Sequence, residues 1–325
     1  MFLSRMLQNV KQSRYIPPII LSILIAIGFV YLTEIIGGIL LGFLGVIAYF
    51  IFMTASGQEI TIEGNYQFDS SQFSNQIFFL FLELSLFIFV ALGVFIWVKW
   101  VEKRKFSSIG FFKKDWLKNL SKGFFVGVLL FTIVVTLLLV MGIGTLQLSN
   151  DLSIEILATI IALIPFWLLQ GGTEELVTRG WLFPMVSAKS NLLIGMLLSS
   201  TLFGAFHLFN AGVTVLSILN IILYGMFACF YMLKTDNMWS LAGVHGAWNF
   251  VQGNIYGIQV SGHNTGFTLF QYTNHSQLDW LSGGEFGAEG SVITSFVLIV
   301  GIIYLYWNLK KDGKLNKSVL FSKTI

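Results

Sequence analysis

Residues 156–180 read ILATIIALIPFWLLQGGTEELVTRG, an apolar run that ends in two adjacent glutamates, Glu174 and Glu175, followed by Arg179. Elsewhere the chain keeps most of its charges out of such runs. Placing an ionised side chain in hydrocarbon costs at least about 2.5 to 3.5 kcal/mol, so an ionisable residue at membrane depth is a candidate for function. These three residues are therefore the first candidates for a functional site.

The composition indicates that most of the chain lies in a membrane. Of 325 residues, 55% are hydrophobic and 11% are charged, whereas about 25% of residues in a soluble domain are charged. Several apolar runs are long enough for the roughly 20 residues that a helix needs to cross a bilayer. We therefore predict an all-α, polytopic helical membrane protein. The net charge of +3 gives no indication of a nucleic-acid partner.

The apolar segments predict about eight transmembrane helices, over residues 17–53, 76–98, 123–146, 154–176, 191–208, 212–233, 239–257 and 291–308. The first segment is longer than one crossing. We expect it to form a tilted helix and an interfacial piece, with a break at Gly37-Gly38.

The distribution of basic residues predicts an orientation. Lysine and arginine concentrate in the connection 99–122 and in the tail after residue 309. Neither residue type occurs in three other connections, residues 54–75, 144–153 and 261–290. Because basic loops stay in the cytoplasm, both termini are predicted to be cytoplasmic. Glu174 would then lie near the inner end of its helix, within reach of cytosolic water.

Helix geometry suggests different roles for the two glutamates. Glu175 and Arg179 are four residues apart, with the acid first, which is the favourable order for an ion pair on one helix face. Glu174 lies about 140° around the helix from Arg179. A salt-bridged helix end would account for Glu175 and Arg179 but not for Glu174, which we expect to face another helix.

Two later helices carry polar residues in helical register. His207 follows Phe203 by four residues, and Asn249 follows His245 by four. A lone histidine in a helix is more often a packed core residue than a functional one. It is much less probable that all of these residues occur together by chance: two histidines, an asparagine in register with one of them, and a glutamate at membrane depth.

Small residues in the same helices favour a shared cavity. Ser200 and Gly204, and Gly243 and Ala247, are pairs four residues apart, a spacing that lets transmembrane helices approach closely. Close approach would bring four polar residues into one cavity: Glu174, His207, His245 and Asn249. Glu34 and Glu83 also lie within apolar segments, where each could line the cavity or form an interhelical hydrogen bond. His263 is predicted to be solvated in an outward loop.

These residue types suit hydrolysis of an amide or ester. A carboxylate and a histidine can deprotonate water, while a second histidine and an amide N–H can stabilise the oxyanion. Alternatively, Glu174, His207 and His245 could hold a zinc ion whose bound water is the nucleophile. The sequence leaves both mechanisms open.

The three motifs, Glu174-Glu175-x-x-x-Arg179, Phe203-x-x-x-His207 and His245-x-x-x-Asn249, occur in this order on successive predicted helices. They resemble the motifs of the CAAX prenyl protease and bacteriocin-processing family, also called the Abi or type II CAAX prenyl endopeptidase family. The resemblance covers about residues 150–260. It implies an eight-helix intramembrane endopeptidase in which Glu174 and His207 activate water and His245 and Asn249 complete the site. Glu175, Arg179 and Phe203 would support them.

The map of apolar segments, with the resemblance placed on its middle part, predicts one membrane domain in three parts. Residues 1–150 would hold the first helices and the basic loop, residues 151–260 the catalytic core, and residues 261–325 the outward loop, last helix and basic tail of one membrane domain. Members of this family are commonly described as metalloproteases, and a metal-free glutamate mechanism is the alternative.

The composition, rich in Phe, Ile, Asn and Lys with one cysteine, is typical of a low-GC Gram-positive bacterium. Such a host lacks prenylated CAAX proteins. We therefore expect a multi-pass plasma-membrane protein, in contact with lipid, that processes peptides or membrane-protein segments. Bacterial family members are linked to peptide maturation and bacteriocin immunity.

Two other classes of function remain as alternatives. A non-catalytic scaffold or sensor-kinase regulator would be expected to lose Glu174 or a motif histidine, and neither is lost. A proton-coupled transporter would more readily show two related halves with broken helices, and the sequence shows no such symmetry.

Overall fold

The computed structural model describes residues 4–55, 73–316 and 320–321. This part of the chain is helical apart from one two-stranded sheet. Its helices are α1 (Arg5–Asn9), α2 (Ile19–Ala55), α3 (Phe73–Ile96), α4 (Trp116–Val140), α5 (Ile154–Glu175), α6 (Phe183–Lys189), α7 (Leu192–Ala205), α8 (Val215–Thr235), α9 (Met238–Phe250), α10 (Asp279–Ser282) and α11 (Val292–Lys311). The strands are β1 (Gly144–Leu148) and β2 (Phe270–Asn274), which pair antiparallel with Gly144 opposite Asn274 and Leu148 opposite Phe270.

The helices confirm a polytopic helical membrane protein. Among the described residues, six helical spans are long and apolar enough to cross a bilayer: Ile19–Gly45, Phe79–Val101, Trp116–Val140, Ile154–Lys189, Val215–Thr235 and Val292–Lys311. The other two predicted segments form α7 and α9, which have 14 and 13 residues and are shorter than a full crossing. The number of crossings, about eight, stays a prediction.

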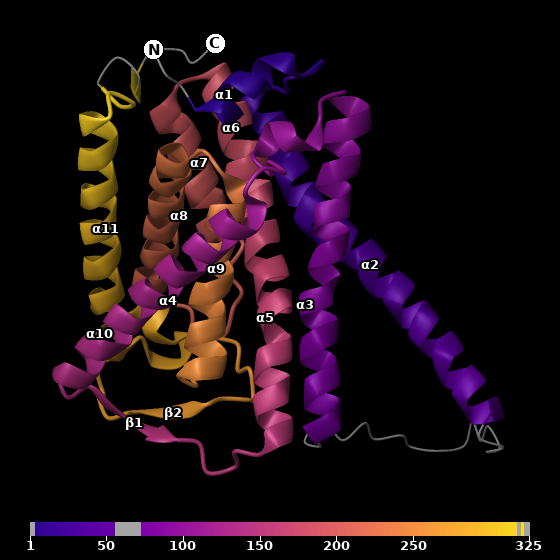
Figure 1. The fold of residues 1–325 in the computed structure, drawn as a ribbon, viewed down its shortest axis with the longest axis vertical. Helices are drawn as coiled ribbons and strands as arrows, with labels where there is room; N and C mark the ends of the chain where they lie inside the picture. The colour runs from indigo at the N-terminus through magenta and orange to yellow at the C-terminus, as the bar shows by residue number, and fades with distance from the viewer. Residues whose placement is uncertain (1–3, 56–72, 317–319, 322–325) are drawn as a thin grey trace.

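The expected break at Gly37-Gly38 is wrong, because α2 is one continuous helix from Ile19 to Ala55. Packing accounts for the first of these glycines. A Cβ atom on Gly37 would lie 2.4 Å from the ring of Phe89 in α3. Gly37 therefore serves the contact between α2 and α3. Figure 1 shows that α2 diverges from the bundle towards its end.

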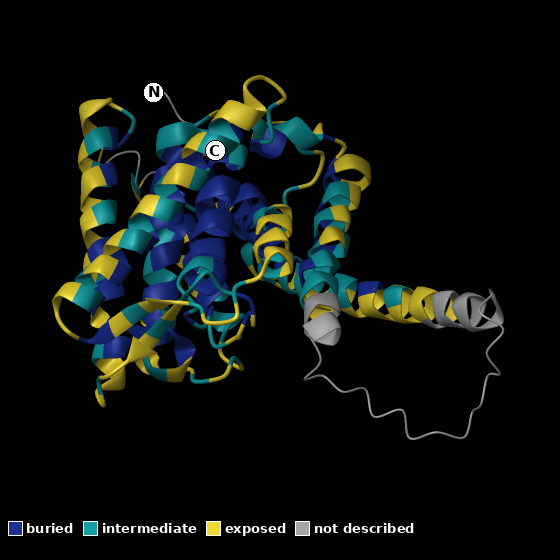
Figure 2. Ribbon diagram, turned by 60° about the horizontal axis from the view of Figure 1, so that its bottom comes forward, coloured by how far each residue is buried: buried dark blue, intermediate teal, exposed yellow. Residues whose placement is uncertain are grey.

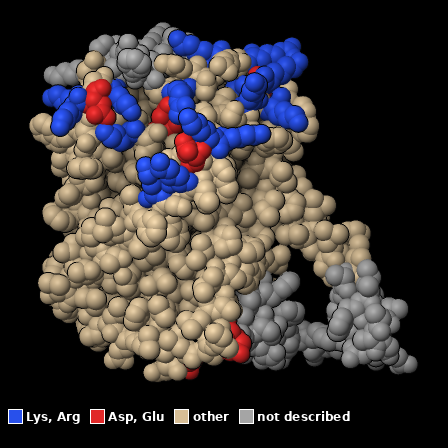
Figure 3. All heavy atoms as spheres, in the orientation of Figure 1, with Lys and Arg blue, Asp and Glu red and all other residues tan. Residues whose placement is uncertain are grey.

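Both ends of the described chain lie on the side where the basic residues gather. Figure 3 shows lysine and arginine side chains concentrated at one end of the molecule, opposite the end that holds β1 and β2 in Figure 1. Arg5 Nε lies 2.7 Å from Asp236 Oδ2, and Lys234 Nζ lies 2.6 Å from Asp312 Oδ2. These ion pairs tie α1 and the end of α11 to the turn between α8 and α9.

The assignment of this end to the cytoplasm stays a prediction. Of the lysine-free connections, residues 144–153 and 261–290 lie at the opposite end, with the strands. Most of the remaining one, residues 56–72, falls outside the described part of the chain.

Helix α9 is the buried centre of the bundle, and all of its residues except Trp239 are buried. Figure 2 shows the buried residues concentrated in the interior of the bundle. Backbone contacts explain this position. A Cβ atom on Gly243 would lie 2.3 Å from the Leu120 carbonyl oxygen of α4, and one on Gly246 would lie 2.7 Å from the Trp167 carbonyl oxygen of α5.

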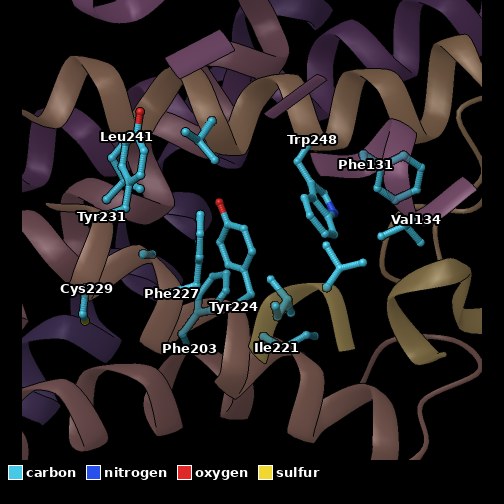
Figure 4. Close-up of a cluster of buried hydrophobic side chains, with 14 of the residues drawn as sticks. Phe131, Val134, Phe203, Ile221, Tyr224, Phe227, Cys229, Tyr231, Leu241 and Trp248 are labelled. Carbon is cyan, nitrogen blue, oxygen red and sulfur yellow. The ribbon is translucent and has the colours of Figure 1, made fainter. Parts of the chain in front are cut away.

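The close approach predicted from small residues is confirmed at all four positions. Ser200 would lie 2.7 Å from a Cβ atom on Gly225, and Ala247 would lie 2.9 Å from one on Gly127. Gly243 meets α4 as described, and a Cβ atom on Gly204 would lie 2.7 Å from the Ile222 side chain of α8. Aromatic side chains fill the space around these contacts. In Figure 4, Tyr224 lies with Phe203 and Phe227, while Trp248 faces Phe131, whose ring centroid is 5.2 Å away.

Candidate active site

The two glutamates lie where the helix that carries them changes geometry. Helix α5 ends at Glu175, a wider π-helical segment follows over Leu176–Leu182, and α6 continues to Lys189. Such π-helical turns are frequent at functional sites. The apolar helical span runs on to Lys189, so the two glutamates lie within it. Their position near the inner membrane face stays a prediction.

The predicted pair between Glu175 and Arg179 is confirmed. Arg179 Nη1 lies 3.3 Å from Glu175 Oε2, and both side chains are completely buried. The guanidinium also donates to Thr178 Oγ1 at 2.6 Å and lies over the ring of Phe203, 4.4 Å from its centroid. Removing one partner of a buried ion pair strongly destabilises a protein. Glu175 and Arg179 therefore form a fixed support for the side chains around them.

A glycine on α8 provides the space for this arginine. A Cβ atom on Gly225 would lie 2.6 Å from Arg179 Nη2 and 2.7 Å from the Cβ atom of Ser200. The sequence analysis missed Gly225, because a single glycine in an apolar helix carries no distinguishing signal. Its role depends on which side chain the fold places opposite.

The imidazole of His245 lies between the two glutamates. Its Nδ1 is 2.9 Å from Glu175 Oε1, and its Nε2 is 3.5 Å from Glu174 Oε2. Because a carboxylate accepts hydrogen bonds, Nδ1 is the nitrogen that donates to Glu175, and this contact fixes the ring. The sequence analysis paired Glu175 with Arg179 alone. The structure shows that both glutamates reach the same histidine.

His207 is held by its own helix. It lies in the turn after α7, and its Nδ1 is 2.8 Å from the carbonyl oxygen of Phe203, four residues earlier. The Phe203 ring lies edge-on to two imidazoles, with centroid distances of 4.9 Å to His207 and 5.8 Å to His245. The Phe-x-x-x-His spacing thus supplies both the carbonyl and the ring that orient these histidines.

Asn249 lies one turn after His245 on α9. Its Nδ2 donates to Gln170 Oε1 at 2.8 Å, while its Oδ1 has no hydrogen-bond partner among the described residues. Gln170 was missed by the sequence analysis, although its position four residues before Glu174 places it on the same helix face. That spacing is a signal that could have identified it.

One cavity of about 340 Å³ brings the four predicted residues together: Glu174, His207, His245 and Asn249. The Glu174 side chain is 20% exposed, whereas Glu175 is fully buried and does not line the cavity. Glu34 and Glu83 also line it, as does His263, whose side chain is 59% exposed, in agreement with its predicted solvation. The cavity therefore receives residues from α2, α3 and an outward loop as well as from the core.

The described lining of the cavity includes no residue from the basic connections. It does include Ser261, His263, Asn264 and Thr265 from the connection that lacks lysine and arginine. That water reaches the site from the basic side stays a prediction. The loop at the opposite end contributes to the wall.

Glu289, just before α11, was missed by the sequence analysis. Trp248 Nε1 donates to its Oε1 at 3.1 Å, and the backbone N–H and the hydroxyl of Ser261 both donate to its Oε2 at 2.8 Å. Burial raises the pKa of this carboxyl above its ordinary value. Glu289 ties the loop at Ser261 to α9 beside the cavity. A loop glutamate carries no sequence signal for such a role.

Residues 156–251 match the family model of the type II CAAX prenyl endopeptidase Rce1-like proteins. This segment is similar to an Rce1-like domain. It runs from α5 through α9 and contains all three sequence motifs, so the predicted resemblance is confirmed over this part of the chain. No curated protein and no solved structure matched the chain.

The arrangement of donors in the Rce1-like segment bears on the zinc hypothesis. No three histidine, cysteine, aspartate or glutamate side chains of the described chain are grouped as a metal site. His207 Nδ1 is occupied by the Phe203 carbonyl oxygen and His245 Nδ1 by Glu175. The proposed ligands line one cavity without forming a coordination set.

Proposed function

We propose that this protein is an intramembrane endopeptidase in which Glu174 activates a water molecule for attack on a peptide bond. The observation that carries the proposal is the position of the Glu174 carboxylate. It lines a cavity beside His245 Nε2, together with His207 and Asn249, inside the Rce1-like segment. A scaffold protein would need neither the cavity nor the aligned polar groups.

In the proposed hydrolysis, one side chain both accepts the proton from water and returns it to the leaving group. Glu174 accepts a proton from water as the water oxygen bonds to the carbonyl carbon, and His207 orients that water through its Nε2. Asn249 Nδ2 and His245 stabilise the negative charge that develops on the carbonyl oxygen. Glu174 then returns the proton to the leaving nitrogen as the C–N bond breaks.

The surrounding residues keep the reacting groups in place. Glu175 fixes the ring of His245 through Nδ1 and is itself held by Arg179. Fixing the geometry before reaction is a large part of enzymatic rate enhancement. Zinc is the alternative source of a more acidic water, with Glu174, His207 and His245 as its ligands, although the described residues do not group these three side chains as a metal site.

The substrate class follows from the surroundings of the cavity. Its walls include α2 and α3, which belong to spans long and apolar enough for the bilayer. A peptide or a segment of a membrane protein lying in the bilayer is therefore the proposed substrate. We retain the proposal of a bacterial plasma-membrane enzyme for peptide maturation or bacteriocin immunity.

The function can be tested with purified protein in lipid nanodiscs and a library of membrane-associated peptides, with products identified by mass spectrometry. We expect cleavage by the wild-type protein and by Glu155→Gln, an exposed acid outside the cavity, but not by Glu174→Gln. The same assay with a chelator separates the metal-free mechanism from the zinc mechanism. Equal cleavage by wild type and Glu174→Gln would favour the scaffold alternative.

A further inference from the structure

The candidate active-site cavity contains more carboxylates than the proposed hydrolysis needs. Its described lining contains four carboxylates, Glu34, Glu83, Glu174 and Glu289, and no lysine or arginine. Glu174 lies beside His245, and Glu289 is held by Trp248 and Ser261. Glu34 and Glu83 are therefore the two acids that have no assigned role.

Neither of these acids has a lysine or arginine partner among the described residues. Glu34 forms no ion pair and no hydrogen bond with them. Glu83 Oε1 lies 4.0 Å from Nδ1 of the His263 imidazole, and both side chains are more than half exposed. Glu34 is repelled by both Glu83 and Glu174. Internal pairing does not explain why two acids lie here.

Both unassigned acids lie within apolar spans, where an acid without a partner is unusual. Glu34 lies in the apolar span Ile19–Gly45 and Glu83 in the span Phe79–Val101, each with a single acidic residue. Acids in transmembrane segments are costly and face a partner, a cavity or a substrate path. Here both line the cavity from α2 and α3, outside the Rce1-like segment. The missing partner would come from a molecule that enters the cavity.

A second observation points independently to a bound molecule that donates hydrogen bonds. Asn249 is 3% exposed and lines the same cavity, and its Oδ1 accepts no hydrogen bond from the described residues. A buried acceptor without a partner is costly and is expected to be satisfied by a ligand. A peptide in the cavity brings N–H donors that could satisfy it.

We propose that Glu34 and Glu83 bind a lysine or arginine side chain of the peptide substrate, close to the bond that is cleaved. This inference rests on the proposed endopeptidase function and specifies its substrate. Charge-assisted hydrogen bonds from a cation to two carboxylates would be shorter and stronger than neutral ones. The same carboxylates repel a free C-terminal carboxylate, so the preferred cleavage site is internal to a basic segment.

The test uses peptides that are identical except for one residue near the cleaved bond, which is lysine, glutamine or glutamate. The quantity measured is the ratio of kcat/KM for the lysine peptide to kcat/KM for the glutamine peptide. We expect about a tenfold ratio for the wild-type protein and a ratio near one for the double variant Glu34→Gln/Glu83→Gln. Glu155→Gln, an exposed acid that does not line the cavity, is the matched control.

A binding measurement keeps this inference separate from the proposed catalysis. The Glu174→Gln protein is titrated with the fluorescent lysine and glutamine peptides, with and without the two additional substitutions, and anisotropy gives each Kd. Tighter binding of the lysine peptide that is lost in the triple variant supports the subsite, even if no peptide is cleaved. Equal Kd values for the two peptides, or a preference that survives the substitutions, would overturn it.

Discussion

Nδ1 of His245 lies 2.9 Å from Oε1 of Glu175, which connects the buried ion pair on α5 to the histidine on α9. The contact makes Glu175 a positioning residue. It holds the ring while its other oxygen faces Arg179, and so it leaves Nε2 of His245 directed at Glu174.

Replacing Glu175 should therefore affect both stability and activity. Glu175→Gln leaves Arg179 buried without its counter-ion, and breaking a buried pair costs about 3 to 5 kcal/mol. We expect a clearly lower thermal midpoint in nanodiscs and a large loss of cleavage. Arg179→Lys, with Glu175 unchanged, should retain part of the stability, because it keeps a positive charge at this position. A Glu175→Gln protein with wild-type stability and activity would contradict the role assigned to the contact.

Gly225 should be intolerant of even one added carbon. In Gly225→Ala, the new Cβ atom would lie 2.6 Å from Arg179 Nη2 and 2.7 Å from Ser200 Cβ. Overpacking of this kind costs about 1 to 3 kcal/mol, and the displaced guanidinium would disturb Glu175. Gly38→Ala is the matched control, because a Cβ atom there meets nothing within 4 Å. Denaturation of both variants in detergent should separate them, and equal stability would refute this explanation of Gly225.

Glu289 should give stability a measurable pH dependence. Burial raises the pKa of its carboxyl in the folded state. The folded protein therefore binds this proton more tightly than the unfolded chain does. The resulting contribution of Glu289 to the free energy of unfolding is fully present below the ordinary carboxyl pKa, and it is lost as pH rises through the raised pKa of the folded state. Glu289→Gln cannot titrate. The difference in thermal midpoint, wild type minus Glu289→Gln, should fall as pH rises through this range.

The contrary result would be a midpoint difference that stays constant or increases across the same pH range. Ser261→Ala provides a second test of the same contact, since its hydroxyl donates to Glu289 Oε2. Losing this donor should raise the Glu289 pKa further. The fall in the midpoint difference should then occur at higher pH.

Much of this fold follows from local rules that the sequence obeys. Apolar runs of bilayer length become helices because a membrane leaves the backbone few other ways to satisfy its hydrogen bonds. The pair between Glu175 and Arg179 follows from a spacing of four on one helix. The common cavity of His207 and His245 could be expected because both lie at membrane depth beside small residues.

The remaining features depend on contacts between helices far apart in the sequence. Gly37 was expected to break α2, but it packs against Phe89 of α3. Glu175 reaches His245, seventy residues later, and Glu289 reaches back to Ser261 and Trp248. Sequence spacing cannot reveal such partners, because they are set by how the helices pack and not by the residues next to them.

The most direct test of the central claim is the rate of peptide cleavage by Glu174→Gln relative to wild type, with both proteins in nanodiscs and shown to fold equally well. If Glu174 is the base that activates water, its removal should lower kcat by about 100- to 10,000-fold without a comparable change in the affinity for the peptide. A Glu174→Gln protein that cleaves the same peptide at the wild-type rate would contradict the account.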